Sequence, residues 1–309
     1  MFAIISDRVG RKPFYTLAGL SSSICHFIYY LAKSSYHFVL GKIGEAVWNA
    51  SLWSVNRAYV MEHSKMKEKV LMKMRGVTNV SLALGSLLVG ILVLFLGYRG
   101  ILLLCSILTI LAGFFGTLLK EKRKERKIVR SDIKMLKKFL IPFFIFGISN
   151  GFAPSYGITL FLQSVGFNSQ LIGVLMCLEM FITGITLALV APRIKNIKLV
   201  SLTFPLSLVF LFILPSQLVV ITFLFFGFGL GMSKAVIENT FPKIVDSKHY
   251  GRDIGILMMG VHVGNTISTA LSGFVISSYG FASSFMLSAL FFIVFLFSTS
   301  KLSKNYFSK

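Results

Sequence analysis

Acidic residues are scarce in this sequence, with 11 Asp and Glu against 32 Lys and Arg among 309 residues, and charged residues of both signs reach only 14%. Soluble globular domains carry about 25% charged residues, so this composition excludes an ordinary water-soluble fold. A net charge of +21 indicates nucleic-acid binding only when the basic residues cover a soluble face. Here they lie between apolar runs, and no nucleic-acid partner is expected.

Cysteine is also rare, and the three present, Cys25, Cys105 and Cys177, all fall within apolar stretches. That placement argues against a disulfide framework and against a metal cluster. The sequence shows no phosphate-binding loop, no metal-spaced His/Cys set and no recognisable Ser/His/Asp motif, so no enzyme, cofactor or metal site is expected. A membrane-embedded enzyme or receptor, the less favoured alternative, requires a catalytic cluster at one interface or a large loop domain, and neither is visible.

Long apolar runs are what the sequence has instead: 55% of the residues are hydrophobic, and the mean hydropathy is +0.79. A helix of roughly 20 apolar residues crosses a bilayer. The runs predict ten full spans, at 14–32, 36–61, 76–97, 99–119, 139–163, 170–191, 199–214, 217–242, 253–277 and 281–299. The fold class predicted is therefore all-α, a polytopic protein of the cell membrane embedded in the lipid bilayer.

The basic residues orient the predicted spans. Of the 32 Lys and Arg, 27 lie in alternate connections, whereas Lys33 lies in one of the other connections and Arg99 stands at the first residue of the span 99–119. Under the positive-inside rule the basic connections are cytoplasmic. The C-terminus is therefore expected in the cytoplasm, and the high net charge needs no further partner.

The longest connection, 120–138, holds ten of the basic residues and separates four spans from six. It predicts a cytoplasmic linker between an N-terminal half, 1–119, and a C-terminal half, 139–309. A solvated basic loop that touches anionic lipid headgroups explains its charge.

One short motif identifies a family. Asp7-Arg8-Val9-Gly10-Arg11-Lys12-Pro13 lies between the short apolar segment 1–5 and the first full span. This order resembles the cytoplasmic signature between the second and third helices of the major facilitator superfamily. The resemblance implies two six-helix halves, of which the ten spans match the third to twelfth helices. It also implies a secondary transporter that moves a small-molecule substrate by alternating access, as a monomer.

The resemblance assigns roles to the motif. Asp7, Arg8, Gly10, Arg11 and Lys12 form the expected gating motif, with Glu62, at the cytoplasmic end of the span 36–61, as the expected partner of Arg11. Asp7 is also expected to face the positive N-terminal end of the helix beginning near Asp253, although Asp253 competes for that position.

The sequence also departs from the family. The matching loop of the second half, Pro192-Arg193-Ile194-Lys195, lacks the acid and the glycine of the motif. Lys42 and Ala46 stand where the family's fourth helix usually carries Arg and Gly, and the Gly-Pro pair of the fifth helix of drug/proton antiporters is missing, which disfavours drug efflux. The first helix and most of the second are absent. The chain is therefore interpreted as beginning at an internal methionine of a longer protein or, alternatively, as a degenerate, transport-inactive remnant.

Ionisable residues within spans are costly and mark candidate paths for substrate or ions. On the span 36–61, one polar stripe contains Lys42, Glu45, Asn49, Asn56 and Arg57. It predicts either a substrate path or a local Lys42–Glu45 pair that joins helices. Lys234 and Glu238 lie one helical turn apart, which predicts either a self-neutralising pair or an inner gate.

Glu179 lies near the middle of the span 170–191 with no base within one turn. An isolated carboxyl group at that depth favours its neutral form, which makes Glu179 a candidate proton carrier; a neutral Glu that bonds a neighbouring helix is the alternative. His262 and Asn265, midway along 253–277, are candidates for that bond or for the path itself. Pro154 breaks the span 139–163, and breaks at membrane depth line cavities. Asn150 and Tyr156 are therefore candidate substrate contacts, with a simple packing kink as the alternative.

Overall fold

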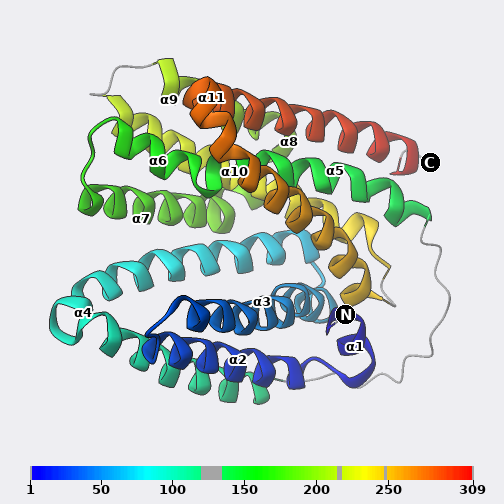
Figure 1. Cartoon of the computed structure of the whole chain (residues 1–309). Helices are drawn as coiled ribbons and strands as arrows, with labels where there is room; N and C mark the ends of the chain where they lie inside the picture. Colours follow the sequence, from blue (N-terminus) through cyan, green and yellow to red (C-terminus); the bar gives the residue numbers. More distant parts are fainter. Residues whose placement is uncertain (1, 120–133, 214–217, 247–248, 308–309) are drawn as a thin grey trace. The chain divides into compact units, whose positions relative to one another are not determined.

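The computed structural model describes residues 2–119, 134–213, 218–246 and 249–307, and all regular secondary structure in them is helical (Figure 1). The predicted all-α class is confirmed. Of the predicted linker 120–138, residues 120–133 lie outside the described residues, and 134–138 belong to α5.

The helices follow the apolar runs closely. Their bounds in the first part of the chain are Phe2–Val9 (α1), Lys12–Tyr30 (α2), Ser35–His63 (α3) and Lys67–Thr117 (α4). After the linker come Lys134–Asn150 (α5), the π-helical turn Gly151–Ser155 (η1), Gly157–Ser164 (α6), Ser169–Ile185 (α7), Thr186–Val190 (η2) and Ala191–Arg193 (η3). The last are Ile197–Val200 (α8), Thr203–Ile213 (α9), Val219–Ile244 (α10) and Tyr250–Phe307 (α11).

Two of the helices, α4 and α11, are each interrupted by one glycine. Gly97 has φ 62° and ψ 171°, and Gly280 has φ 79° and ψ 172°. This backbone region is essentially restricted to glycine. Each glycine falls where the sequence predicts a break between two spans. In α4 the break lies between 76–97 and 99–119, and in α11 it lies between 253–277 and 281–299.

Among the described residues, the continuous apolar helices number fewer than the ten spans predicted. Five helical stretches in this part of the chain are long and apolar enough to cross a membrane: Lys67–Thr117, Leu136–Ser164, Ser169–Arg193, Val219–Ile244 and Tyr250–Leu302. One reason is that α4 and α11 each merge two predicted spans across a glycine. The other is that the helices at 14–32 and 36–61 carry more polar residues, and the apolar helical stretch at 197–213 is short.

The described chain divides into two compact units. One contains residues 1–65, 86–131 and 245–255, and the other contains 66–85, 132–244 and 256–309, apart from the undescribed positions. The units therefore interleave along the chain, since the start of α4 belongs to the second unit and the start of α11 to the first. The division into halves 1–119 and 139–309 stays a prediction.

In the first unit, α2 packs against α3 and against the second part of α4 (Figure 1). A Cβ on Gly19 would lie 2.5 Å from Cα of Gly113, so only glycine permits this crossing of α2 and α4. One turn further along, the hydroxyl groups of Ser23 and Ser106 are 2.8 Å apart. The crossing is thus fixed by small and hydroxyl side chains, as is typical of helices in membranes.

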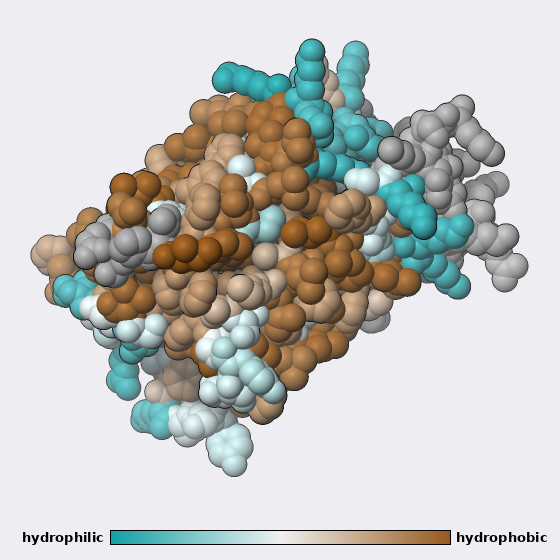
Figure 2. Space-filling model, turned by 90° about the horizontal axis from the view of Figure 1, so that it is seen from above, coloured by the Kyte–Doolittle hydropathy of each residue, from teal (hydrophilic) through white to brown (hydrophobic). Residues whose placement is uncertain are grey.

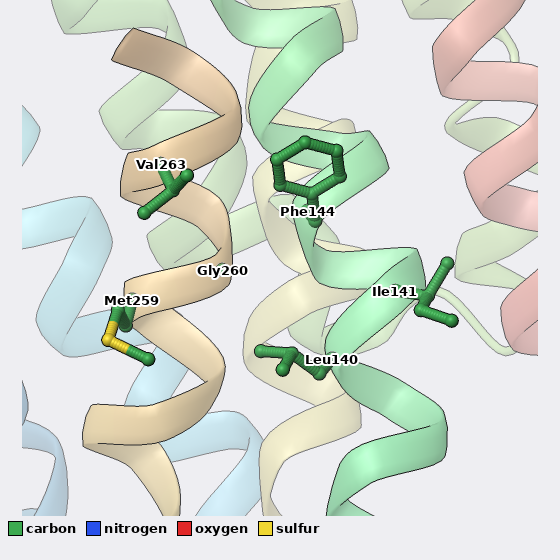
Figure 3. Close-up of a pocket in the computed structure, with 6 residues that line it drawn as sticks. All are labelled: Leu140, Ile141, Phe144, Met259, Gly260 and Val263. Atoms are coloured by element: carbon green, nitrogen blue, oxygen red, sulfur yellow. The ribbon is translucent and has the colours of Figure 1, made fainter. Parts of the chain in front are cut away.

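In the second unit, α5 crosses α11 at an equally close distance. A Cβ on Gly264 would lie 2.2 Å from the carbonyl oxygen of Phe144. Beside this crossing is a groove of about 310 Å³, lined by Leu140, Ile141, Phe144, Met259, Gly260 and Val263 (Figure 3). None of these lining residues carries a charge.

The surface is apolar over large areas. Figure 2 shows hydrophobic residues over most of the face presented, with hydrophilic residues towards its edges. On α4, the side chains of Leu94 and Phe95 are 81% and 80% exposed. Exposed side chains of this kind are stable in lipid and costly in water, which agrees with a multi-pass membrane protein.

Candidate functional site

The motif at residues 7–13, expected to act as a gate, forms a tight turn between α1 and α2. Gly10 has φ 98°, in the left-handed region that favours glycine. Pro13 lies in the first turn of α2, where its missing N–H costs no hydrogen bond. The turn places Arg11 directly before α2, and Arg11 is only 3% exposed although it is charged.

Arg11 is the centre of an ion-pair cluster. Its guanidinium donates to Asp7 at 2.5 Å, to Glu62 of α3 at 2.8 Å and to the hydroxyl of Ser6. Burial by itself lowers the pKa of Arg11, but the hydrogen bonds and negative charges of Glu62 and Asp7 outweigh it and leave the pKa raised. The pairing of Arg11 with Glu62 expected from the family resemblance is therefore present.

Asp7 also binds the beginning of α11. Its two carboxylate oxygens accept backbone N–H groups of Gly251 at 3.0 Å and Arg252 at 2.8 Å, in the first turn of the helix. These groups have no partner within the helix, and the helix dipole is positive there. Asp253 does not compete for them, because its own carboxylate accepts from the backbone N–H of Asp246 and from the side chain of Arg252.

The structure thus brings together Asp7, Arg11 and Glu62 but not every residue of the motif. Arg8 is exposed and Lys12 is half-buried.

The polar stripe of α3 begins with a local ion pair. Lys42 Nζ lies 2.6 Å from Glu45 Oε2, three residues on, and the side chain of Lys42 is 71% exposed. Lys42 also lines an otherwise apolar groove with Phe2 and Val39, of about 480 Å³. Asn49 accepts a hydrogen bond from the indole N–H of Trp53 at 2.8 Å. Their contribution to a substrate path stays a prediction.

A second cluster of charges lies within the second unit. Glu179 of α7 is 5% exposed, and the hydroxyl of Thr183, one turn further on, lies 2.8 Å from its Oε1. Lys234 of α10 interacts electrostatically with Glu179 and with Arg75, near the start of α4. A buried carboxyl group therefore has a hydroxyl within hydrogen-bond distance and feels the positive charge of a lysine on another helix.

Glycines allow α7 and α10 to approach closely at this cluster. A Cβ on Gly227 would lie 3.2 Å from the carbonyl oxygen of Glu179, and one on Gly231 would lie 2.7 Å from Cβ of Thr186. Gly227, Gly231 and Lys234 are spaced by four and three residues, so they share one face of α10. Gly227 and Gly231 therefore serve close packing of α10 against α7 and η2.

Glu238, on the same face of α10, is 1% exposed. The sequence offers a local pair between Lys234 and Glu238, whereas in the structure Lys234 is attracted by the charge of Glu179 and repelled by that of Arg75. Sequence reasoning missed Arg75 and Thr183. The sequence pattern places Arg75 in a connection, because the predicted span begins at residue 76. In the structure α4 begins nine residues earlier, at Lys67, so Arg75 is helical. The spacing of Thr183, four residues after Glu179, is the signal that was available.

The predicted break near Pro154 is present as η1, the π-helical turn between α5 and α6. The hydroxyl of Ser155 in this turn lies 3.1 Å from Oδ1 of Asn265 on α11 and 3.2 Å from the carbonyl oxygen of Asn150. The turn therefore connects Asn150 with Asn265. Tyr156 and His262 are exposed, and their contact with a substrate stays a prediction.

The family can now be stated. The sequence model of the Major Facilitator Superfamily matches residues 1–235 and 139–303, and the chain belongs to this family. Its members are membrane transporters of small-molecule substrates and not enzymes. No curated protein sequence matches the chain.

Solved structures of this family have the same fold. The human organic anion transporter MFSD10 (TETRAN) is similar with a TM-score of 0.78 and 15% identity, over 96% of this chain and 79% of that one. The E. coli fucose:proton symporter FucP has a TM-score of 0.71 and 12% identity, over 98% and 86% of the two chains. A structure of FucP in the outward conformation has a TM-score of 0.71 and 13% identity, over 98% of this chain and 85% of that one.

Proposed function

We propose that this chain moves a small solute across the cell membrane by alternating access, and that a proton carried by Glu179 drives the movement. The observation that carries the proposal is the burial of Glu179 in α7, where Thr183 hydrogen-bonds its carboxyl group and the positive charge of Lys234 acts on it. A group that binds and releases a proton during transport needs both of its charge states to be tolerated. Lys234 supports the ionised form, and burial among apolar helices supports the neutral one.

The fold neighbours agree with such a mechanism without fixing it. FucP is a proton symporter for fucose, and MFSD10 is an organic anion transporter. For this chain, Asn150 and Asn265 beside η1 are proposed contacts for the substrate, because π-helical turns and broken helices leave polar groups available at membrane depth.

The motif cluster is proposed to close the cytoplasmic side. Asp7 holds the first turn of α11 through two backbone N–H groups, and Arg11 holds Asp7 against Glu62. Breaking these contacts separates α11 from α1 and α3. The C-terminus is proposed to be cytoplasmic, and the chain is proposed to act as a monomer. The alternative to this function is a transport-inactive fragment of such a transporter.

Reconstitution into proteoliposomes tests the proton role. Uptake of radiolabelled fucose and of an organic anion is measured with a proton gradient and, separately, as exchange without one. Because Glu179→Gln fixes the residue in a neutral form, it should keep exchange and lose accumulation driven by protons. Exchange needs no net proton movement, so a folding defect is distinguished by loss of both.

Glu45→Gln is the matched control, because Glu45 is the other acid of the predicted path and is held by the exposed Lys42. It should retain proton-driven accumulation. If Glu179→Gln accumulates substrate as well as the parent, the proton role of Glu179 is wrong, and loss in Glu45→Gln alone assigns it to α3. A parent chain that neither exchanges nor accumulates any substrate supports the inactive-fragment alternative.

A further inference from the structure

Thr183 is placed between the carboxyl group of Glu179 and the backbone of α10. Its Oγ1 lies 2.8 Å from Oε1 of Glu179 and 2.9 Å from the carbonyl oxygen of Gly227. Thr183 is fully buried, so water does not share in these bonds. Both neighbours are acceptors when Glu179 is ionised, but a hydroxyl group has one hydrogen and donates to one of them at a time.

We infer that Thr183 is a positioning residue that passes the protonation state of Glu179 to α10, an inference that rests on the proposed proton role of Glu179. When Glu179 is ionised, the hydroxyl of Thr183 donates to the carboxylate, and the carbonyl of Gly227 is without this donor. When Glu179 takes up a proton on Oε1, its own O–H donates to Oγ1 of Thr183. The hydrogen of Thr183 then turns to the carbonyl of Gly227, and no covalent bond other than that of the added proton forms.

The packing makes this transfer direct. Because Gly227 has no side chain, α10 approaches the backbone of α7 closely enough for a threonine hydroxyl to reach a helical carbonyl. Glycine also makes this stretch of α10 intrinsically the easiest to deform. Protonation of Glu179 therefore adds a hydrogen bond from Thr183 of α7 to the carbonyl of Gly227, in the most deformable stretch of α10. Loss of the proton removes that bond.

The charged group that acts on Glu179 is Lys234 of α10, and Lys234 in turn is repelled by Arg75 at the start of α4. Glu238 is buried one turn beyond Lys234 on α10. None of them is bonded to the hydroxyl of Thr183, whose two partners are Glu179 and Gly227. The hydroxyl is thus a separate element of the cluster that substitution can remove without changing any charge.

Deuterium exchange of the purified full chain in lipid vesicles tests the inference. The amides of 224–232 are followed in Thr183→Val, which removes the hydroxyl and keeps the shape, and are compared with the parent at the same pH so that intrinsic exchange rates cancel. In acidic buffer the variant should exchange faster by about threefold, the factor expected for one hydrogen bond in a membrane. In alkaline buffer, where Thr183 of the parent donates to Glu179, the two should be equal.

Two variants complete the test. Thr183→Ser restores the hydroxyl and should match the parent at both pH values. Thr240→Val removes a buried hydroxyl that donates only to Val236 of its own helix, so its effect should not depend on pH. An equal ratio of Thr183→Val to parent in acid and alkali would overturn the inference and leave Thr183 a structural residue.

Infrared difference spectra of the same samples separate this failure from a failure of the proposed function. A carboxyl band that appears on acidification and is lost in Glu179→Gln shows that Glu179 titrates. If that band is present and the exchange ratio does not depend on pH, only the role of Thr183 is wrong. If no such band exists, both the proton role of Glu179 and the inference built on it are overturned.

Discussion

At the scale of single residues, Asp7 joins the motif to the start of α11. One carboxylate accepts from the guanidinium of Arg11 and from two backbone N–H groups at the start of α11. Hydrogen bonds to a charged group contribute about 1.5–3 kcal/mol each, more than bonds between neutral groups. The contact therefore depends on the charge of Asp7 as well as on its shape.

Asp7→Asn keeps the size and one acceptor oxygen of the side chain and removes its charge. We expect substrate exchange in proteoliposomes to slow or stop while insertion into the membrane is unchanged, because the residue lies outside the apolar spans. The measurement is the initial exchange rate per inserted protein. Arg8→Gln, at an exposed position of the same motif, is the control and should have a smaller effect. Normal exchange in Asp7→Asn would contradict the gating role.

The acids of the two candidate sites show what a sequence can predict about single residues. Glu179 is recognisable from its depth in an apolar run and from the absence of a nearby base. The positive charge that acts on it is not recognisable from the sequence, because Lys234 comes from α10, 55 residues further along the chain. Glu62, in contrast, is predicted as the partner of Arg11, because the family resemblance implies this long-range contact. Hydrophobic periodicity alone does not predict it.

At the scale of the elements, glycines decide where helices bend and where they touch. Gly280 has φ 79°, and no other atom lies within 4 Å of a Cβ built on it. Gly280→Ala therefore tests backbone strain alone, which costs about 1–3 kcal/mol. We expect a lower midpoint of thermal unfolding in detergent. Gly273→Ala, in equally open space but without positive φ, should be stabilised by about 0.5–1 kcal/mol, and equal shifts in both variants would contradict the strain at Gly280.

Gly76 has the opposite environment. A Cβ there would lie 2.6 Å from the backbone nitrogen of Ala188 and 2.6 Å from the carbonyl oxygen of Gly184. Neither atom can yield without moving a helix, so Gly76→Ala should cost about 1–3 kcal/mol, as overpacking typically does. Thermal unfolding against Gly85→Ala, where no atom lies within 4 Å, is the measurement. An unchanged midpoint in Gly76→Ala would show that the contact of α4 with α7 and η2 is not close in solution.

Apolar runs predicted where helices lie more reliably than where they end. The segments 139–163, 170–191 and 217–242 correspond to continuous apolar stretches in the structure. The glycines at 97 and 280 mark breaks that hydropathy located, although the backbone turns there without leaving a loop. The early start of α4 was missed because its first residues, such as Lys67 and Lys69, are charged, and charge in a helix near the membrane surface leaves no mark on an apolar pattern.

At the scale of the whole molecule, the asymmetry of basic residues predicts one orientation. Single cysteines at Ser131 and at Ser283, on a cysteine-free background, test it with a thiol reagent that does not cross the membrane. In intact cells we expect labelling at Ser283, in the connection after the span 253–277, and none at Ser131 until the cells are opened. Labelling of Ser131 but not Ser283 would reverse the orientation and place the C-terminus outside.

The division of the chain into units has a consequence for any attempt to take the molecule apart. Residues 66–85 belong to the unit that otherwise begins at 132, and residues 245–255 belong to the unit built from 1–65 and 86–131. A cut in the linker therefore yields two polypeptides, each of which carries a segment that completes the other. Such pieces are related as in domain swapping: each is a poor solitary protein and a specific ligand for its counterpart. Expressed together, the two pieces should assemble into the complete fold. Expressed singly, each piece should leave exposed the surface against which its missing segment packs.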